Sequence, residues 1–197
     1  MSQKLSRESF VKDSLDLRSS DLFNWDMLIV SSIFKEDLKG DESEKEVIKG
    51  YANAVNCIAT AIKHQNHPNA RVLAFRCDSL MVPFLFLVRH TVELILKYLR
   101  RMLKLSSPNK HGLLSLWVEI EKIILQQNNS KKEVMDDIKV FISALEEIDP
   151  DGSHARYSKD VKGKLYHEKP KFIKVQMLNN FLQKEMLPLI DASLYEG

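Results

Sequence analysis

The residues of this chain whose side chains are best suited to catalysis or binding lie inside an apolar segment. This segment is FLFLVRHTVELILKYLRR, at positions 84–101. Arg89 and His90 are adjacent, and Glu93 and Lys97 follow Arg89 at intervals of four residues. An arginine can bind an anion through its guanidinium group, and a histidine can act as a general acid or base. The segment therefore contains residue types suited to a functional polar site, and equally those of a buried ion-pair network.

These polar side chains fall on one stripe of a helix. If residues 79–105 are helical, Arg89, Glu93 and Lys97 share about a third of the circumference, and His90 lies at the edge of that arc. The rest is apolar, so we expect neighbouring helices to bury the stripe near Arg89. Because buried charges need partners, two interpretations stay open: a salt-bridge network that fixes helix packing, or a functional polar site that faces a groove.

Further polar candidates follow in the chain. His111 stands between a loop and an apolar segment, where an imidazole usually caps a helix and less often acts in catalysis. The polar stretch 149–171 contains Asp149, Arg156 and Tyr157. Arginine and tyrosine in such a stretch suit the binding of a phosphate or carboxylate, and they equally suit an ion pair that pins the loop to the protein.

Hydrophobic periodicity predicts the elements that must position these residues. Apolar side chains recur at helical spacing in six segments, which lie near residues 19–38, 41–66, 79–105, 113–127, 128–148 and 172–195. Residues 67–77 break the pattern and are predicted as a loop or a short extended piece. We expect an all-α helical bundle of five to six helices in a single domain over residues 1–197. Residues 1–20 are expected to be loosely ordered, with a polar loop or small hairpin over 149–171 before the last helix.

Composition limits the possible classes of protein. The chain has 197 residues, 44% of them apolar, and a formal net charge of +2, so bulk charge does not indicate nucleic-acid binding. The two cysteines lack metal-type spacing, and we expect neither a metal nor a cofactor. The longest apolar run, residues 80–88, is about half of the roughly 20 residues that span a bilayer. With no apolar leader either, a cytoplasmic protein without membrane contact is expected.

Three segments in this order resemble a group of uncharacterised bacterial proteins that look like HEPN-type helical bundles. They are PFLFLVRHTVELILKYL, KHGLLSLW and ALEEIDPDGSHARYSKD, within residues 78–160. The group has an Arg-His-x-x-Glu-Leu helix, an HdLxxLW-like segment and an iDpxsxxFRYp-like segment. Active HEPN proteins carry an arginine and a histidine four to six residues apart on one helix, whereas Arg89 adjoins His90 here. The residues that match the motifs are Arg89, His90, Glu93, His111, Trp117, Asp149, Arg156 and Tyr157.

The resemblance implies a core of four or five helices, often dimeric. Many HEPN proteins are metal-independent ribonucleases of toxin–antitoxin, CRISPR and phage-defence systems, and others are non-catalytic modules that bind nucleotides or proteins. For this chain the resemblance implies an RNA-related role. The candidate catalytic residues are then Arg89, His90 and His111. In the alternative, the protein is a non-catalytic module for dimerisation, partner docking or nucleotide binding, with Tyr157 or Trp117 stacked on a base. The polar cluster or ligand site then comprises Glu93, Lys97, Asp149, Arg156 and Tyr157. The expected partners are RNA or a nucleotide, a partner protein, and a second copy in a homodimer.

Overall fold

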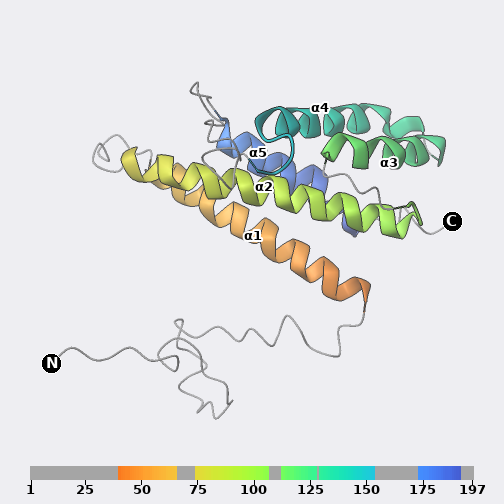
Figure 1. Ribbon diagram of the computed structural model, residues 1–197, viewed down its shortest axis with the longest axis horizontal. Helices are drawn as coiled ribbons and strands as arrows, with labels where there is room; N and C mark the ends of the chain where they lie inside the picture. Colours follow the sequence, from red (N-terminus) through yellow and green to blue (C-terminus); the bar gives the residue numbers. More distant parts are fainter. Residues whose placement is uncertain (1–39, 66–73, 107–111, 128, 154–172, 192–197) are drawn as a thin grey trace, which may run out of the picture. The chain divides into compact units, whose positions relative to one another are not determined.

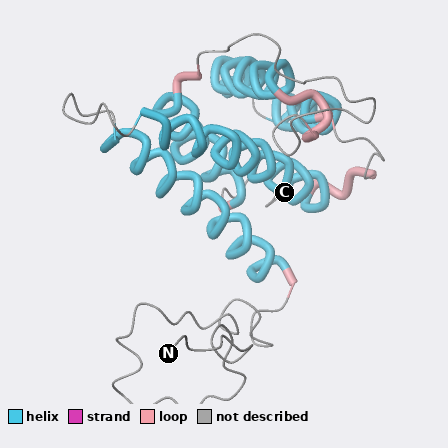
Figure 2. The backbone as a smooth tube through the Cα atoms, turned by 60° about the vertical axis from the view of Figure 1, so that its left-hand side comes forward, coloured by secondary structure: helices cyan, strands magenta, loops and turns pink. Residues whose placement is uncertain are grey.

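The described regular elements are all helical, as Figure 2 shows. A computed structural model describes residues 40–65, 74–106, 112–127, 129–153 and 173–191. These residues belong to the unit Lys39–Gly197, and the unit Met1–Leu38 lies outside the described residues. The all-α prediction is confirmed for the described part of the chain. The predicted helix near 19–38, the loosely ordered residues 1–20 and the hairpin within 149–171 lie outside it, apart from residues 149–153.

Two long helices form the centre of the bundle. Helix α1 (Asp41–Gln65) runs antiparallel beside α2 (Ala74–Met102) in Figure 1. The apolar stripe predicted for α1 is buried, and small residues at Ala52 and Ala59 bring its backbone close to its neighbours. The buried apolar residues of α2 include Phe84, Val88, Val92, Ile95, Leu96, Tyr98 and Leu99.

Helix α2 begins at Ala74, five residues before the predicted start at Ser79. The prediction of a loop or extended piece is therefore wrong for residues 74–77. Pro83, which favoured a start nearby because proline fits the first turn, instead lies inside the helix. A proline there removes one backbone hydrogen bond. The completely buried Phe84 beside it packs into the core and favours the helical backbone at this point.

A helical hairpin lies beside α2. Helix α3 (Leu113–Gln127) leads through the 3-10 turn η4 (Asn129–Lys131) into α4 (Lys132–Ile148), and α3 packs against both α2 and α4. Trp117 is completely buried in the core, which excludes the predicted possibility that it stacks on a ligand base. Val134 was predicted to face the core, but it is 43% exposed and Met135 takes the buried position.

The C-terminal helical segment changes its hydrogen-bond pattern twice. Helix α5 (Val175–Phe181) continues as the π-helix η5 (Leu182–Met186) and ends as the 3-10 helix η6 (Leu187–Ile190). The sequence predicted one helix over 172–195, kinked or shortened by Pro188. Pro188 has no N–H to donate to the carbonyl four residues earlier, which favours such a departure from α-helical bonding. The described helical part ends at Ile190.

Three amide side chains attach this C-terminal segment to α1. Gln176 and Gln183 donate through Nε2 to the backbone oxygens of Ala59 and Ala52, each at 2.7 Å. Between them, Asn179 Nδ2 donates to the side-chain oxygen of Asn56 at 2.9 Å. These bonds fix the register of α5 and η5 along α1, and so they hold one wall of the groove described below.

Helix α2 ends in a left-handed turn. The Leu105 N–H donates to the Arg100 oxygen at 2.9 Å and the Lys104 N–H to the Arg101 oxygen at 3.0 Å. Lys104 has a φ of 54°. This is the Schellman arrangement, in which glycine usually occupies the left-handed position. Lysine at that position costs conformational free energy because its Cβ is crowded there.

The part of α2 over Ser79–Met102 is long and apolar enough to cross a membrane by length and composition. Its length exceeds the roughly 20 residues needed to span a bilayer, which the apolar run 80–88 did not reach. In the bundle, 39% of its most apolar window is buried, and α2 packs against α1 and α3. The expectation of a cytoplasmic protein without membrane contact stays a prediction.

Candidate functional site

Arg89 is buried and binds the C-terminal end of α4. Only 4% of its surface is exposed. Its Nε donates to the Asp149 backbone oxygen at 2.7 Å, and its Nη2 donates to the Pro150 oxygen at 3.3 Å. The last carbonyls of a helix lack intrahelical partners and carry partial negative charge. A guanidinium group at this place therefore satisfies two acceptors just beyond α4 and neutralises part of that charge.

Glu93 completes this contact on α2 itself. Arg89 Nη1 lies 3.1 Å from Glu93 Oε2, and Lys97 Nζ lies 2.7 Å from Glu93 Oε1. The Glu93 side chain is 12% exposed and that of Lys97 is 42% exposed, so the stripe runs from the interior to solvent within two turns. Each of the three guanidinium nitrogens of Arg89 thus donates a hydrogen bond within the bundle. We call Arg89, Glu93 and the end of α4 at Asp149–Pro150 the α2–α4 clamp.

The chain turns sharply where the clamp holds it. Asp149 is the C-cap of α4, its N–H donates to the Leu145 oxygen at 2.9 Å, and it is 2% exposed. Asp151 Oδ1 then accepts hydrogen bonds from the Ser153 N–H and hydroxyl, at 2.9 and 2.5 Å. Gly152 between them has a φ of 79°, which side chains disfavour. Asp149–Gly152 is therefore a turn that ends α4.

His90 points to a different neighbour from Arg89. Its ring lies edge-on to Tyr51 of α1, with centroids 4.9 Å apart, and stacks on Phe86 at 5.6 Å. Arg89 meanwhile bonds to the end of α4. Residues adjacent in a helix diverge by about 100°, so the two side chains do not converge as a catalytic pair. Their chemistry is divided between two contacts, one with α1 and one with α4.

The structure thus brings together Arg89, Glu93, Lys97 and the Asp149 backbone. It places His90 on the α1 side of the same helix. His111, Arg156 and Tyr157 lie outside the described residues, so their predicted place in this cluster stays a prediction. The stripe was interpreted either as a salt-bridge network or as a functional polar site. The described contacts bear on this choice only for Arg89, and they are contacts that hold helices together.

Two further arginines of α2 make similar contacts. Arg100 is 3% exposed and donates to the Leu116 oxygen at 3.2 Å and to Glu119 at 2.5 Å, which ties α2 to α3. Arg101 pairs with Asp41 and Glu44 at the start of α1. The hydrogen bond that Arg101 donates to the Asp41 carboxylate raises the pKa of Arg101 above its ordinary value. The polar stripe of α2 therefore bonds to three neighbouring helices.

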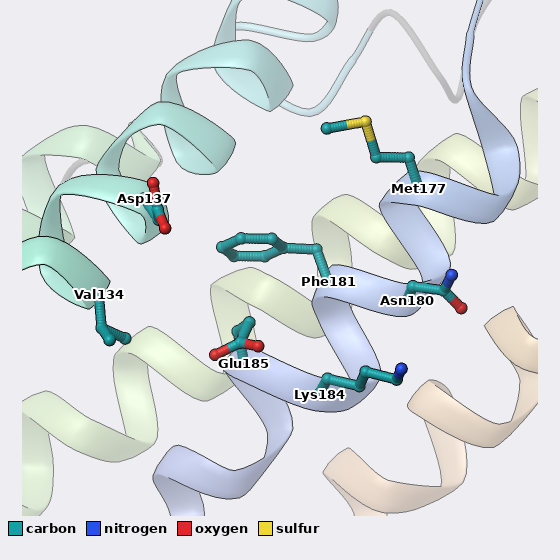
Figure 3. A pocket seen from close by; sticks show the side chains of 7 residues that line it. All are labelled: Val134, Asp137, Met177, Asn180, Phe181, Lys184 and Glu185. Atoms are coloured by element: carbon teal, nitrogen blue, oxygen red, sulfur yellow. The ribbon is translucent and has the colours of Figure 1, made fainter.

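A groove lies between α4 and the C-terminal segment in the described part of the chain. It consists of two cavities of about 590 and 420 Å³ that share Asp137, Met177 and Phe181. Phe141 of α4 and Phe181 of α5 stack across it with centroids 4.5 Å apart. Figure 3 shows Phe181 extending from α5 toward α4. The pair joins the two walls, and both rings line the second cavity.

The walls of the second cavity are more apolar than an ordinary solvated surface. Val140 and Met177, on opposite walls, are 69% and 64% exposed. The larger share of the second cavity is lined by apolar side chains, which are Val140, Phe141, Ala144, Ile148, Ile173, Met177, Leu178 and Phe181. Sequence analysis missed the groove. One signal was present: the apolar residues of α4 cover a wider arc than one neighbouring helix can bury.

The described residues contain no group of three His, Cys, Asp or Glu side chains placed to hold a metal ion. The expectation of no metal and no cofactor stays a prediction. Comparison with protein-family models, with curated protein sequences and with solved structures finds no match to this chain.

Proposed function

We propose that this protein is a non-catalytic helical module that binds a partner protein in the groove between α4 and the C-terminal segment. The observation that carries the proposal is the exposure of Val140 and Met177 above two adjoining cavities. A hollow lined mainly by apolar side chains is the usual form of a binding site on a protein surface. Binding a partner removes it from water, which is the main driving force of association.

The α2–α4 clamp supports this function. Arg89 holds the C-terminal end of α4 on α2 through Asp149 and Pro150. The amides of Gln176, Asn179 and Gln183 hold the opposite wall on α1. Both walls are thus anchored to the central helices, and a preorganised site loses less conformational entropy when it binds.

Site-specific photo-crosslinking in cells tests the proposal. A photoreactive phenylalanine analogue would replace Val140 in the groove, or Val118 on α3 as the matched control, since both valines are exposed and Val118 lines neither cavity. We expect a discrete protein adduct from position 140 that is absent from position 118. Adducts from neither position, or equal adducts from both, would contradict a partner site in the groove.

The second candidate is an RNA-related role, in which this protein acts as a metal-independent ribonuclease. It is favoured by the contact between two of the three segments that carry the HEPN resemblance, since Arg89 of the first bonds to Asp149 of the third. Purified protein would be incubated with mixed single-stranded and structured RNA in EDTA, beside a His90→Gln variant with an unchanged melting temperature. Cleavage by the wild type but not by the variant would support this candidate. No cleavage by either protein would leave the binding module as the proposal.

A further inference from the structure

We infer that the partner segment is an amphipathic helix with basic residues at one end. This inference rests on the proposed function and names the chemistry of its partner. The α4 wall runs from Val134 to Ile148, which at about 1.5 Å per residue is roughly 20 Å, or about four helical turns. A helix seated in such a groove uses apolar anchors at positions i, i+3 or i+4, and i+7.

The apolar end of the groove would receive those anchors. Val140, Ala144 and Ile148 recur along α4 at intervals of four residues, and Met177 of α5 lies on the opposite wall. A row with this spacing can interdigitate with the side chains of a neighbouring helix. The stacked rings of Phe141 and Phe181 line the same cavity, so the anchors of a partner would contact them.

The first cavity of the groove contains two carboxylates. Glu185 of η5 lines it together with Asp137 of α4, which is shared with the second cavity, and with Lys184. Figure 3 shows their carboxylates on the two sides of Phe181, while the Lys184 side chain points away from α4. Within the described part of the chain, neither carboxylate forms an ion pair or hydrogen bond. Burying them under a neutral or acidic segment would be unfavourable, whereas lysine or arginine would pair with them.

The charges also orient the occupant and disfavour a second copy of this chain. Lys174 lines the apolar end, opposite the carboxylates, so the basic residues of the partner are expected at the Asp137–Glu185 end. The groove-lining arc of α4 contains Asp137 and, by helical geometry, Glu133, whereas the exposed Lys132 and Lys139 lie outside that arc. A second α4 in the groove would therefore bring carboxylates against carboxylates.

The test uses the full chain and two fluorescent peptides of about 14 residues, a length that spans about four helical turns. Both peptides have leucines at i, i+3 and i+7 spacing. They differ only at their charged positions, which are lysines in one peptide and glutamates in the other. Fluorescence anisotropy would give their dissociation constants. We expect the lysine peptide to bind at least about tenfold more tightly than the glutamate peptide. Equal affinities, or no binding of the lysine peptide, would overturn the inference.

Variants locate the binding. Val140→Ser combined with Met177→Ser should lower the affinity for the lysine peptide at least about tenfold. Val118→Ser on α3 should leave that affinity unchanged. Asp137→Asn with Glu185→Gln should abolish the preference for lysine over glutamate. If the groove variant binds as the wild type does, the site is wrong. A concentration-dependent dimer in sedimentation velocity that Val140→Ser/Met177→Ser abolishes would likewise overturn the inference in favour of a second copy.

The two proposals fail separately. Adducts from position 140 without binding of the lysine peptide would contradict the basic helix and keep a partner protein in the groove. Absence of adducts together with absence of peptide binding would contradict both.

Discussion

The α2–α4 clamp and the groove use α4 in opposite ways. At the clamp, a buried guanidinium group bonds to the end of the helix, and the polar side chains are paired. Along the groove, the same helix exposes Val140, and Asp137 faces open space without a partner in the described part of the chain. The residue types with the richest chemistry thus serve packing, while the surface open to other molecules is mainly apolar.

The comparison separates residue type from residue role. Arginine is the residue type best suited to binding an anion, yet the three guanidinium nitrogens of Arg89 each donate a hydrogen bond inside the bundle. A buried polar group must find partners whatever its intrinsic chemistry. A valine has no such demand, so its exposure depends only on which helices happen to cover it. Exposed apolar surface is therefore the more informative signal in this molecule.

The largest expected effect is at the clamp. Arg89→Ala should lower the free energy of unfolding by about 3–5 kcal/mol, because it leaves Glu93 and the two carbonyls after α4 without their partner. Urea denaturation followed by circular dichroism would measure the loss. Lys97→Ala, which removes the exposed member of the same network, should cost less than about 1 kcal/mol. An Arg89→Ala variant as stable as the wild type would show that the clamp does not hold α4.

The two faces of α4 provide the next test. Ile138 is completely buried and Val140 is 69% exposed, two residues apart on one helix. Ile138→Ala should cost about 2–5 kcal/mol, whereas Val140→Ala should change stability by no more than about 0.5 kcal/mol. Thermal and urea denaturation of both variants would check this. A large loss in Val140→Ala would mean that the groove is covered in the folded protein, and the contrast with the clamp would disappear.

A pH titration tests the other end of α2, where Tyr98 is 1% exposed. Burial raises its pKa, and the ammonium of Lys45 partly opposes that rise. Because the folded pKa exceeds the unfolded value of about 10, the contribution of Tyr98 to stability is complete below pH ~10 and is lost as pH rises through the folded pKa.

Unfolding free energies at pH 8 to 11 would be compared for the wild type and Tyr98→Phe. We expect the wild type to lose more stability than the variant over the upper part of this range. The hydrogen bond to Glu42 also raises the pKa of Lys45, so part of the decline should persist in the variant. Identical pH profiles would contradict the burial of an ionisable tyrosine in the bundle.

The smallest expected effect has the opposite sign. Lys104 ends α2 with a φ of 54°, and it is exposed. Lys104→Gly removes the crowding of Cβ and should stabilise the protein by up to about 1 kcal/mol. Chemical denaturation would detect the gain, with Lys104→Ala as the control that keeps Cβ and should give none. A less stable glycine variant would indicate that the Lys104 side chain contributes more than its backbone conformation costs.

Local patterns predicted much of the fold. The ranges expected for α1 and α3 match those observed, because their apolar residues recur at helical spacing and mark the buried face. The predictions failed where neighbours decide. Val134 and Met135 are both apolar and adjacent, and only the position of α3 and α5 determines which of them is covered. The start of α2 at Ala74 was likewise missed, because the residues up to Cys77 break the apolar pattern and Asp78 or Ser79 can cap a helix that begins later.

The site was predicted in part. Helical spacing alone placed Arg89, Glu93 and Lys97 on one stripe and required partners for the buried charge. It did not identify those partners, because the Asp149 and Pro150 carbonyls are backbone groups that occur in every residue. The groove was missed for a related reason, although the wide apolar arc of α4 was present in the sequence. It exists because α4 and α5 meet mainly at one aromatic pair, which is a fact about separation in space.

The sequence by itself determined that this protein is helical in its described part, which faces of α1 and α3 are buried, and that a polar stripe on α2 must be paired. Those properties follow from the local period of apolar side chains and from the cost of burying charge. Only the tertiary structure decided that Arg89 closes on the end of α4, that His90 turns to α1, and that one flank of α4 stays open. These outcomes depend on how helices pack, and helical periodicity contains no information about the distance to the next helix.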